Sequence, residues 1–137
     1  MLIKHQTQRQ ARRAFTLMEM LVVVAIIVML AGIGGYYFVQ AQEDAKKGAA
    51  KAQTKVLTQA CDAYRISHGT YPASLQVLLQ RDEEGGPYLK TPDAIIDPWR
   101  QPYQYNAQGP QNNGNQPDIW CVSPNNGQQI GNWALSK

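Results

Sequence analysis

An uninterrupted apolar run near the amino terminus is the strongest feature of the hydrophobic pattern. Residues 20–39 carry no charge, and 17 of these 20 residues are apolar, the other three being glycines. About 20 apolar residues in a helix that rises ~1.5 Å per residue span the ~30 Å hydrocarbon core of a bilayer. The pattern therefore predicts a helix that crosses a membrane, and it argues against a fully soluble globule.

Helical periodicity continues beyond the apolar run as far as residue 68. Apolar side chains recur there every three or four residues, and charged side chains occupy the other face. No proline interrupts residues 15–68, and Gly69 supplies a stop signal. We therefore expect one helix of about 50 residues. Its second half, residues 40–68, should bury a stripe made of Ala41, Ala45, Ala49, Ala52, Val56, Leu57, Ala60, Cys61 and Tyr64.

Shorter elements follow the long helix. Residues 75–79 form a short apolar segment that predicts a second helix, capped by Ser74. Strands are expected at residues 102–105, 118–122 and 130–135, and residues 106–117, rich in Gln, Asn and Gly, predict a loop. The pattern thus indicates an α+β fold, in which the amphipathic half of the helix packs on a small antiparallel sheet. A soluble part of this size holds only a small core.

The distribution of charge adds an orientation to this picture. The formal net charge is +3, but residues 1–14 carry four cationic side chains and no acid, whereas residues 15–137 carry 9 basic and 10 acidic side chains. The basic character therefore belongs to the first 14 residues, and we expect no nucleic-acid partner. Positive charge ahead of an apolar run keeps that end in the cytoplasm. We expect a single pass through the membrane with the amino terminus cytoplasmic.

The boundary between the basic segment and the apolar run is more specific. The sequence Arg12-Arg13-Ala14-Phe15-Thr16-Leu17-Met18-Glu19 resembles the prepilin leader of type IV pilins and type II secretion pseudopilins. The resemblance implies that a prepilin peptidase removes residues 1–14 by cleavage between Ala14 and Phe15. It also implies N-methylation of Phe15 and retention of residues 15–39 as the transmembrane half of the helix. Ala14 stands where this superfamily usually has glycine.

Glu19 is the candidate residue for subunit assembly. A carboxylate at the start of a membrane helix costs roughly 2–3 kcal/mol on insertion scales, so it normally has a partner. The apolar run offers no cation. The resemblance implies that Glu19 pairs with the freed amino group of a neighbouring subunit, which would also fix the register between subunits. The alternative is a side chain that reaches from the helix start to the membrane interface.

Motifs in the second half of the chain narrow the resemblance. Asp97-Pro98-Trp99, Pro102-Tyr103 and Ile130-Gly131-Asn132-Trp133 follow the order of the major pseudopilin family of type II secretion, protein G, over nearly the whole chain. The resemblance implies a type IV pilin-like fold with residues 69–137 as a periplasmic head. It further implies an inner-membrane subunit that polymerises into a pseudopilus and drives export of folded proteins across the outer membrane.

Several partners follow from this resemblance. They are other copies of the chain, minor pseudopilins, the inner-membrane assembly platform with its ATPase, the prepilin peptidase and the lipid bilayer. Two alternatives stay open: a type IV or DNA-uptake pilin of a surface fibre, and a single-pass membrane protein that does not polymerise. Among catalytic patterns, the sequence has no nucleophile elbow, phosphate loop or paired-carboxylate cleft, so we expect no enzyme.

The resemblance also implies a calcium site in the loop before Ile130. Calcium takes six to eight oxygen ligands, with carboxylates supplying the charge. Residues 123–129 contain no carboxylate, which leaves Ser123, Asn125 and Asn126 as weak candidate ligands. We expect hydrogen bonds among Asn and Gln side chains to hold this loop instead, with no firm cofactor.

The two cysteines leave two alternatives open. Cys61 lies on the predicted helix stripe and Cys121 in the strand expected to cover it, so they form either a disulfide or two buried thiols. Neither shows a Cys/His spacing typical of metal sites. His68 ends the predicted helix, where a surface role is expected.

Overall fold

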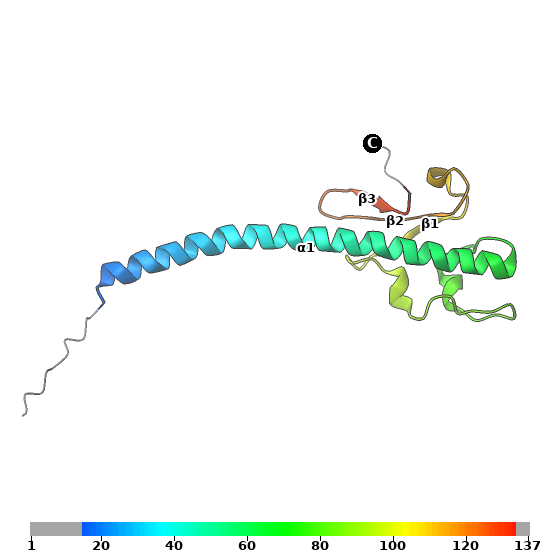
Figure 1. Ribbon diagram of the computed structural model, residues 1–137, viewed down its shortest axis with the longest axis horizontal. Coiled ribbons are helices and arrows are strands. Elements are labelled where there is room, and N and C mark those ends of the chain that lie inside the picture. Colours follow the sequence, from blue (N-terminus) through cyan, green and yellow to red (C-terminus); the bar gives the residue numbers. More distant parts are fainter. Residues whose placement is uncertain (1–14, 134–137) are drawn as a thin grey trace, which may run out of the picture. The chain divides into compact units, whose positions relative to one another are not determined.

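A computed structural model describes residues 15–133, so the predicted leader, Ala14 included, lies outside the described residues, as do residues 134–137. The described residues divide into two compact units, residues 15–40 and 41–133. Helix α1 spans Leu17–His68, a length of 52 residues, and confirms the expected long helix (Figure 1).

In the first unit, residues 17–40 of α1 keep their apolar side chains exposed. An 18-residue window of α1 has a mean hydropathy of 2.6 and none of it is buried. The large apolar side chains from Leu17 to Val39 are each at least half exposed. An exposed apolar surface of this length requires a nonaqueous environment or protein partners. By length and composition, this helix is able to cross a membrane.

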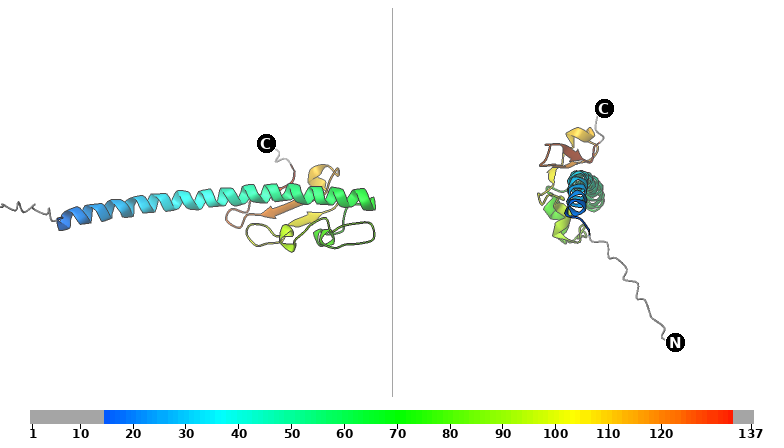
Figure 2. Two further views of the ribbon diagram at one scale, coloured as in Figure 1. Left: turned by 60° about the horizontal axis from the view of Figure 1, so that its bottom comes forward. Right: turned by 90° about the vertical axis from the view of Figure 1, so that its left-hand side faces the viewer.

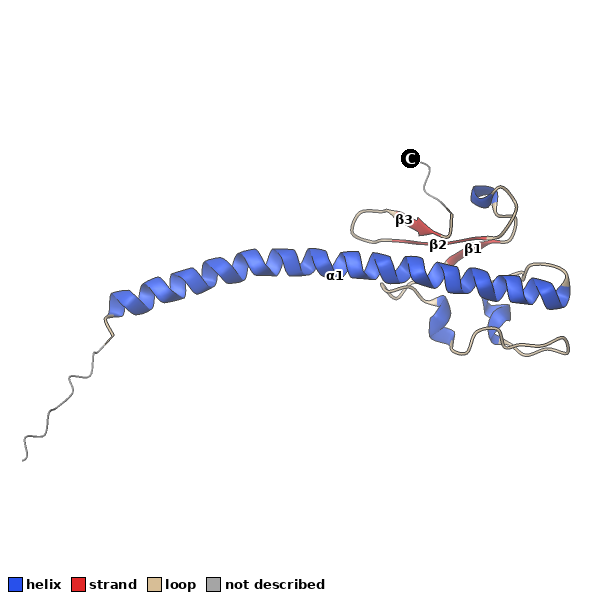
Figure 3. Cartoon of the chain, in the orientation of Figure 1, coloured by secondary structure: helices blue, strands red, loops and turns tan. Residues whose placement is uncertain are grey.

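In the second unit, three short strands form an antiparallel sheet beside residues 41–68 of α1. The strands are β1 Gln104–Asn106, β2 Asp118–Val122 and β3 Gln129–Gly131, in the order β1-β2-β3. Three 3₁₀ helices, η1 Leu75–Leu79, η2 Pro92–Ile95 and η3 Pro110–Asn112, lie in the connecting segments. The sheet and the pair η1 and η2 lie on different sides of this part of the helix (Figures 1 and 2). Loops make up most of the rest of the head (Figure 3).

Several short elements differ from their predictions. Strand β1 begins at Gln104 rather than at residue 102, and the expected loop at residues 106–117 contains η3. Residues 75–79 are a 3₁₀ helix, and the Ser74 side chain makes no capping hydrogen bond. Three residues per turn bring Leu75 and Leu78 onto the same side, and both are buried. Strand β3 ends at Gly131, and the register pairs Trp120 with Gly131. The strand stops there because the next backbone N–H of β2, that of Ile119, donates to the Asn132 side chain (3.1 Å).

The buried face of α1 is rotated from the predicted stripe. Its buried residues are Ala50, Thr54, Leu57, Ala60 and Cys61. Thr54 is buried without penalty because its hydroxyl donates to the Lys51 carbonyl oxygen (2.9 Å). The predicted stripe is therefore wrong over its first half, where Ala41, Ala45, Ala49, Ala52 and Val56 are all exposed. Alanine is too weakly apolar to decide which face of a helix turns inward.

The core of the head forms where this face meets the sheet and the connecting segments. Leu57, Leu78 and Ile119 are fully buried, and they come from α1, η1 and β2. The other buried apolar residues are Ala50, Ala60, Cys61, Leu75, Leu89, Ile95, Tyr103, Cys121 and Ile130. Within residues 15–133 no strand exceeds five residues. Packing on the helix therefore stabilises a sheet that is too small to be stable alone.

Asn132 connects the end of the sheet to the helix. Its side-chain amide donates to the Thr58 hydroxyl (2.9 Å) and to the Pro117 carbonyl oxygen (2.8 Å). Its side-chain oxygen accepts from the Ile119 N–H and from the Asn112 amide, both at 3.1 Å. One side chain therefore joins α1, η3 and β2. These hydrogen bonds account for the asparagine in the Ile130-Gly131-Asn132-Trp133 sequence.

Replacing Asn132 by alanine should destabilise the head. The change leaves several polar partners without hydrogen bonds, which costs about 2 kcal/mol, and lowers Tm by roughly 10 °C for a domain of about 100 residues. Thermal unfolding of the detergent-solubilised chain, followed by near-ultraviolet circular dichroism, measures this change. The matched control is Asn115→Ala, an exposed loop residue whose side chain makes no hydrogen bond with the residues that the structure describes. Equal Tm values for the two variants would contradict this role of Asn132.

Candidate functional site

The start of α1 is closed by a reciprocal pair of hydrogen bonds between Thr16 and Glu19. The backbone N–H of Glu19 donates to the Thr16 hydroxyl oxygen (3.2 Å), and the backbone N–H of Thr16 donates to Glu19 Oε2 (2.9 Å). The Thr16 hydroxyl also lies 3.2 Å from Oε2. This is a capping box, in which each side chain satisfies a backbone donor that the first helical turn leaves free.

The capping box gives Glu19 a role within its own chain that the sequence analysis missed. Its signal was present, because Thr followed three residues later by Glu before an apolar run is the pattern of a capping box. Both hydrogen bonds from Thr16 go to Oε2. Among residues 15–133, no donor bonds Oε1, so this second oxygen is open to a cation from elsewhere.

The Asp97-Pro98-Trp99 sequence forms a turn that contacts the helix. Oδ1 of the buried Asp97 accepts hydrogen bonds from the backbone N–H groups of Trp99 (2.9 Å) and Gln101 (2.8 Å). This turn presents the Trp99 indole, whose Nε1 donates to Glu43 Oε2 at 3.2 Å. The motif is therefore a folded connection to α1, which accounts for the acid, the proline and the tryptophan together.

Glu43 is held by donors from two segments. Lys46 of the same helix forms an ion pair with it at 3.2 Å, and Trp99 donates to it from the turn. Desolvation raises the pKa of Glu43, but the hydrogen bonds from Lys46 and Trp99 outweigh it, so its pKa lies below the ordinary value. The carboxylate stays ionised at neutral pH and keeps these donors together.

Two tyrosines attach the strand region to the rest of the head. Tyr103 donates from its hydroxyl to the Ala50 carbonyl oxygen (3.3 Å), and Tyr105 donates to the Pro72 carbonyl oxygen (2.7 Å). Burial raises the pKa of both phenols, so they remain donors at neutral pH. Tyr103, from the Pro102-Tyr103 motif, and Tyr105 thus position this region in the fold.

The closing loop, residues 123–129, is held by the amide groups that the sequence suggested. The Asn126 side-chain oxygen accepts the Gln128 backbone N–H (3.1 Å), and its amide donates to the Gln128 side-chain oxygen (3.4 Å). Backbone bonds between Ser123 and both Gly127 and Gln128, each 2.9 Å, complete the turn.

These residues do not fit a calcium ion. The loop supplies no carboxylate, and the Asn126 side-chain oxygen is already used by a backbone donor. The Ser123 hydroxyl is fully buried and makes no hydrogen bond, but one neutral hydroxyl does not replace the charge that calcium requires. Of the three candidate ligands, the Asn126 side chain is used within the loop, and all three lack the negative charge that calcium requires.

In this structure both cysteines are free and buried, which corresponds to the second of the two alternatives. Cys61 lies on the buried face of α1 and Cys121 in β2, where its thiol lies 3.9 Å from the Ile130 carbonyl oxygen. Desolvation raises the pKa of Cys61 to about 12 and that of Cys121 to about 11. Both residues act as small apolar side chains in the core.

An amphipathic helix that follows an apolar one and packs on a small antiparallel sheet is the arrangement of a pilin-like subunit. Residues 37–132 match the family described as type II secretion system (T2SS), protein G, and residues 9–35 match the prokaryotic N-terminal methylation motif. The chain belongs to the type II secretion system protein G family, a family of structural subunits rather than of enzymes. It is a pseudopilin of the type II secretion system.

Three relatives illustrate this similarity, and each is named type II secretion system core protein G. The chain is 34% identical to the protein of Pseudomonas aeruginosa over 113 residues, which cover 74% of the chain and 78% of the relative. It is 28% identical to that of Klebsiella pneumoniae, covering 93% and 99%, and 28% identical to that of Aeromonas hydrophila, covering 74% and 78%. The expectation of a pseudopilin over a surface-fibre pilin is confirmed.

The thiols should be unreactive in the folded chain. At pH 8 both are buried and protonated, whereas an ordinary cysteine with a pKa near 8.5 is partly thiolate. We expect no labelling by a thiol-specific reagent in the native state and two labelled cysteines per chain after unfolding. Mass spectrometry counts the labels, and free glutathione controls for reagent activity. No labelled cysteine after unfolding without a reductant would instead indicate a disulfide.

Proposed function

We propose that the working form of the chain begins at Phe15 and polymerises in the inner membrane into a periplasmic pseudopilus. Cleavage between Ala14 and Phe15 by a prepilin peptidase and methylation of Phe15 would produce this form. The match to the N-terminal methylation motif supports both steps, and so does the position of Phe15, 75% exposed just before α1.

The charge pattern supports an orientation for this subunit. Four cationic side chains precede the apolar run, which favours a cytoplasmic amino terminus. The unit of residues 41–137 then lies in the periplasm, and residues 15–39 cross the inner membrane. Buried thiols in the core are compatible with that oxidising compartment because they are inaccessible.

The two oxygens of Glu19 carry the assembly proposal. Oε2 closes the helix start through Thr16, and Oε1 is the oxygen that would accept the charged amino group of Phe15 from a neighbouring subunit. One carboxylate can therefore cap its own helix and pair with another chain at the same time. In the low-dielectric bilayer, such a pair compensates two charges that are costly alone.

The proposed mechanism is mechanical. New subunits held in the bilayer join the base of the filament, and the lengthening pseudopilus pushes folded proteins through an outer-membrane channel. An ATPase and an inner-membrane assembly platform supply the energy and the site of addition, and minor pseudopilins are further partners. The membership of the chain in the protein G family supports this role.

Substitutions of Glu19 separate its two roles. Glu19→Gln retains an oxygen that can cap the helix but removes the charge, whereas Glu19→Ala removes both. We expect both variants to enter the membrane and to lose filament assembly, measured by cross-linking of neighbouring subunits and by secretion into the medium. Asp44→Asn, which alters a largely exposed acid of the same helix, is the control and should assemble normally. Normal assembly of Glu19→Gln would show that capping alone is needed.

Deletion of the gene tests the system as a whole. Mass spectrometry of culture-medium and periplasmic proteins should find exported proteins stranded in the periplasm. An unchanged set of secreted proteins with lost fibres, motility or DNA uptake would contradict the secretion role. No change in any of them would support a membrane protein that does not polymerise.

We also propose that the closing loop works without calcium. The absence of carboxylates from residues 123–129 and the hydrogen bonds of Asn126 support this proposal. The Tm of the detergent-solubilised chain should be the same in calcium and in a calcium chelator. A calcium-dependent increase in Tm that Asn125→Ala removes would contradict the proposal and restore this loop as a metal site.

A further inference from the structure

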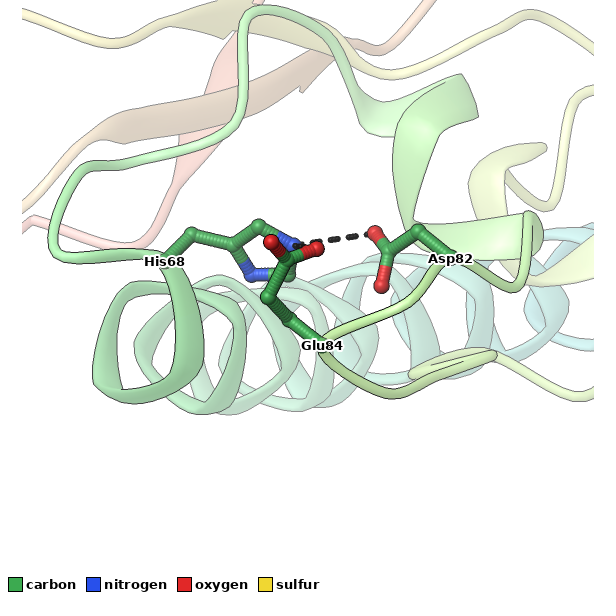
Figure 4. Close-up of side chains that lie close together, drawn as sticks. All are labelled: His68, Asp82 and Glu84. Carbon is green, nitrogen blue, oxygen red and sulfur yellow. Dashed lines mark hydrogen bonds and ion pairs between the residues drawn. The ribbon is translucent and has the colours of Figure 1, made fainter.

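Three side chains that could ligate a metal converge at the carboxyl end of α1. His68 is the last residue of the helix, and Asp82 and Glu84 come from the turn after η1 (Figure 4). His68 Nε2 lies 2.9 Å from Asp82 Oδ2 and 3.6 Å from Glu84 Oε2. One ligand atom from each residue lies within 4.8 Å of the others.

The imidazole ring of His68 is fixed with Nε2 directed at the carboxylates. Nδ1 lies 3.1 Å from the Tyr64 carbonyl oxygen, which can only accept, so Nδ1 carries a hydrogen. The ring also stacks on that of Tyr64, with centroids 3.9 Å apart and planes 2° apart, and the edge of Tyr88 contacts it. Histidines that ligate metals show this arrangement, in which one nitrogen donates to a carbonyl and the other binds the ion.

The carboxylates are positioned by a turn of the main chain. Asp82 Oδ1 accepts the Gly85 N–H (2.9 Å), and the Asp82 N–H donates to the Gly85 carbonyl oxygen (3.0 Å). This arrangement leaves Oδ2 directed at His68. Gly86 follows with φ +79°, and a Cβ there would lie 2.8 Å from the Gln80 carbonyl oxygen, so the turn requires glycine. The Gly-Gly sequence thus shapes the loop that carries Asp82 and Glu84.

The arrangement of this cluster suits a cation. Two carboxylates face Nε2, whereas Nδ1 is directed at the Tyr64 carbonyl oxygen. A divalent ion matches the two negative charges and lets all three side chains contribute a ligand atom.

We propose that His68, Asp82 and Glu84 form a binding site for a divalent transition-metal ion, with Zn²⁺ the best fit. Zinc takes imidazole nitrogen and carboxylate oxygen at about 2.0–2.2 Å, and tetrahedral geometry then places ligand atoms roughly 3.3–3.5 Å apart. The two distances from Nε2, 2.9 and 3.6 Å, bracket that spacing. The imidazole ligand disfavours calcium and magnesium, which prefer oxygen alone. Water would complete the coordination of this partly exposed site.

Zinc binding by the full chain, purified without a histidine tag in detergent micelles, tests this proposal. Equilibrium dialysis against ZnCl₂ followed by elemental analysis measures the bound metal, and thermal unfolding measures its effect on Tm. We expect one zinc ion per chain at this site and a higher Tm in zinc, because the ion binds the folded state. His5 is present in every variant, so any zinc that it holds is the same in all.

Neutral substitutions of the ligands give the decisive comparison. Glu84→Gln leaves His68 and the turn in place, and it should weaken zinc binding by at least about 10-fold. His68→Asn should do the same and also remove the increase in Tm. The matched control is Glu83→Gln, which changes the neighbouring exposed acid outside the cluster and should bind zinc as the unaltered chain does. Equal zinc binding by the unaltered chain and Glu84→Gln would overturn the proposal and leave a protonated histidine between two acids.

Discussion

The buried face of α1 is the surface on which the rest of the head is assembled. Ala50, Thr54, Leu57 and Cys61 follow at intervals of three and four residues, and the sheet and the 3₁₀ segments pack around this part of the helix. Strands of three to five residues cannot bury enough area to be stable alone. The fold of the head therefore depends on the same helix whose first part is the membrane segment.

Hydrogen bonds to the helix add precision to this packing. Tyr103 donates to the Ala50 carbonyl oxygen, and Gln53 donates to the Ala94 carbonyl oxygen at 2.8 Å. Asn132 donates to Thr58, and Trp99 donates to Glu43. Each bond joins positions at least 41 residues apart along the chain. Apolar contacts supply the stability, and these directed bonds fix where along the helix each segment lies.

The sequence predicted the broad fold because its signals were long or particular. The helix from residue 17 to residue 68 follows from periodicity and the absence of proline, and β2 follows from its β-branched and aromatic residues. Which face of the helix is buried was harder to predict from the sequence. The exposed part of the predicted stripe consists of four alanines and Val56. Thr54 is polar but buried, because its hydroxyl donates to the Lys51 carbonyl oxygen. The periodicity of apolar residues does not reveal a hydrogen bond that makes a polar side chain acceptable in the core.

The candidate sites also differ in how well the sequence predicts them. The capping box of Thr16 and Glu19 is a local pattern that can be recognised from the sequence alone. By contrast, His68 contacts Asp82 and Glu84 across 14 and 16 residues, and this contact depends on how η1 and the Gly-Gly turn fold back. No sequence motif with a fixed spacing would have predicted that these three residues meet. The absence of acids from residues 123–129 was plain in the sequence, but the use of the Asn126 oxygen by Gln128 needed the coordinates.

The bond between Asn132 and Thr58 has a consequence for the order of events during synthesis. Its partners are 74 positions apart along the chain. A ribosome adds residues from the amino terminus, so the apolar segment emerges long before the head is able to close. The apolar segment is therefore complete while the head is still open, and the head gains this bond to the helix only after residue 132 has been added.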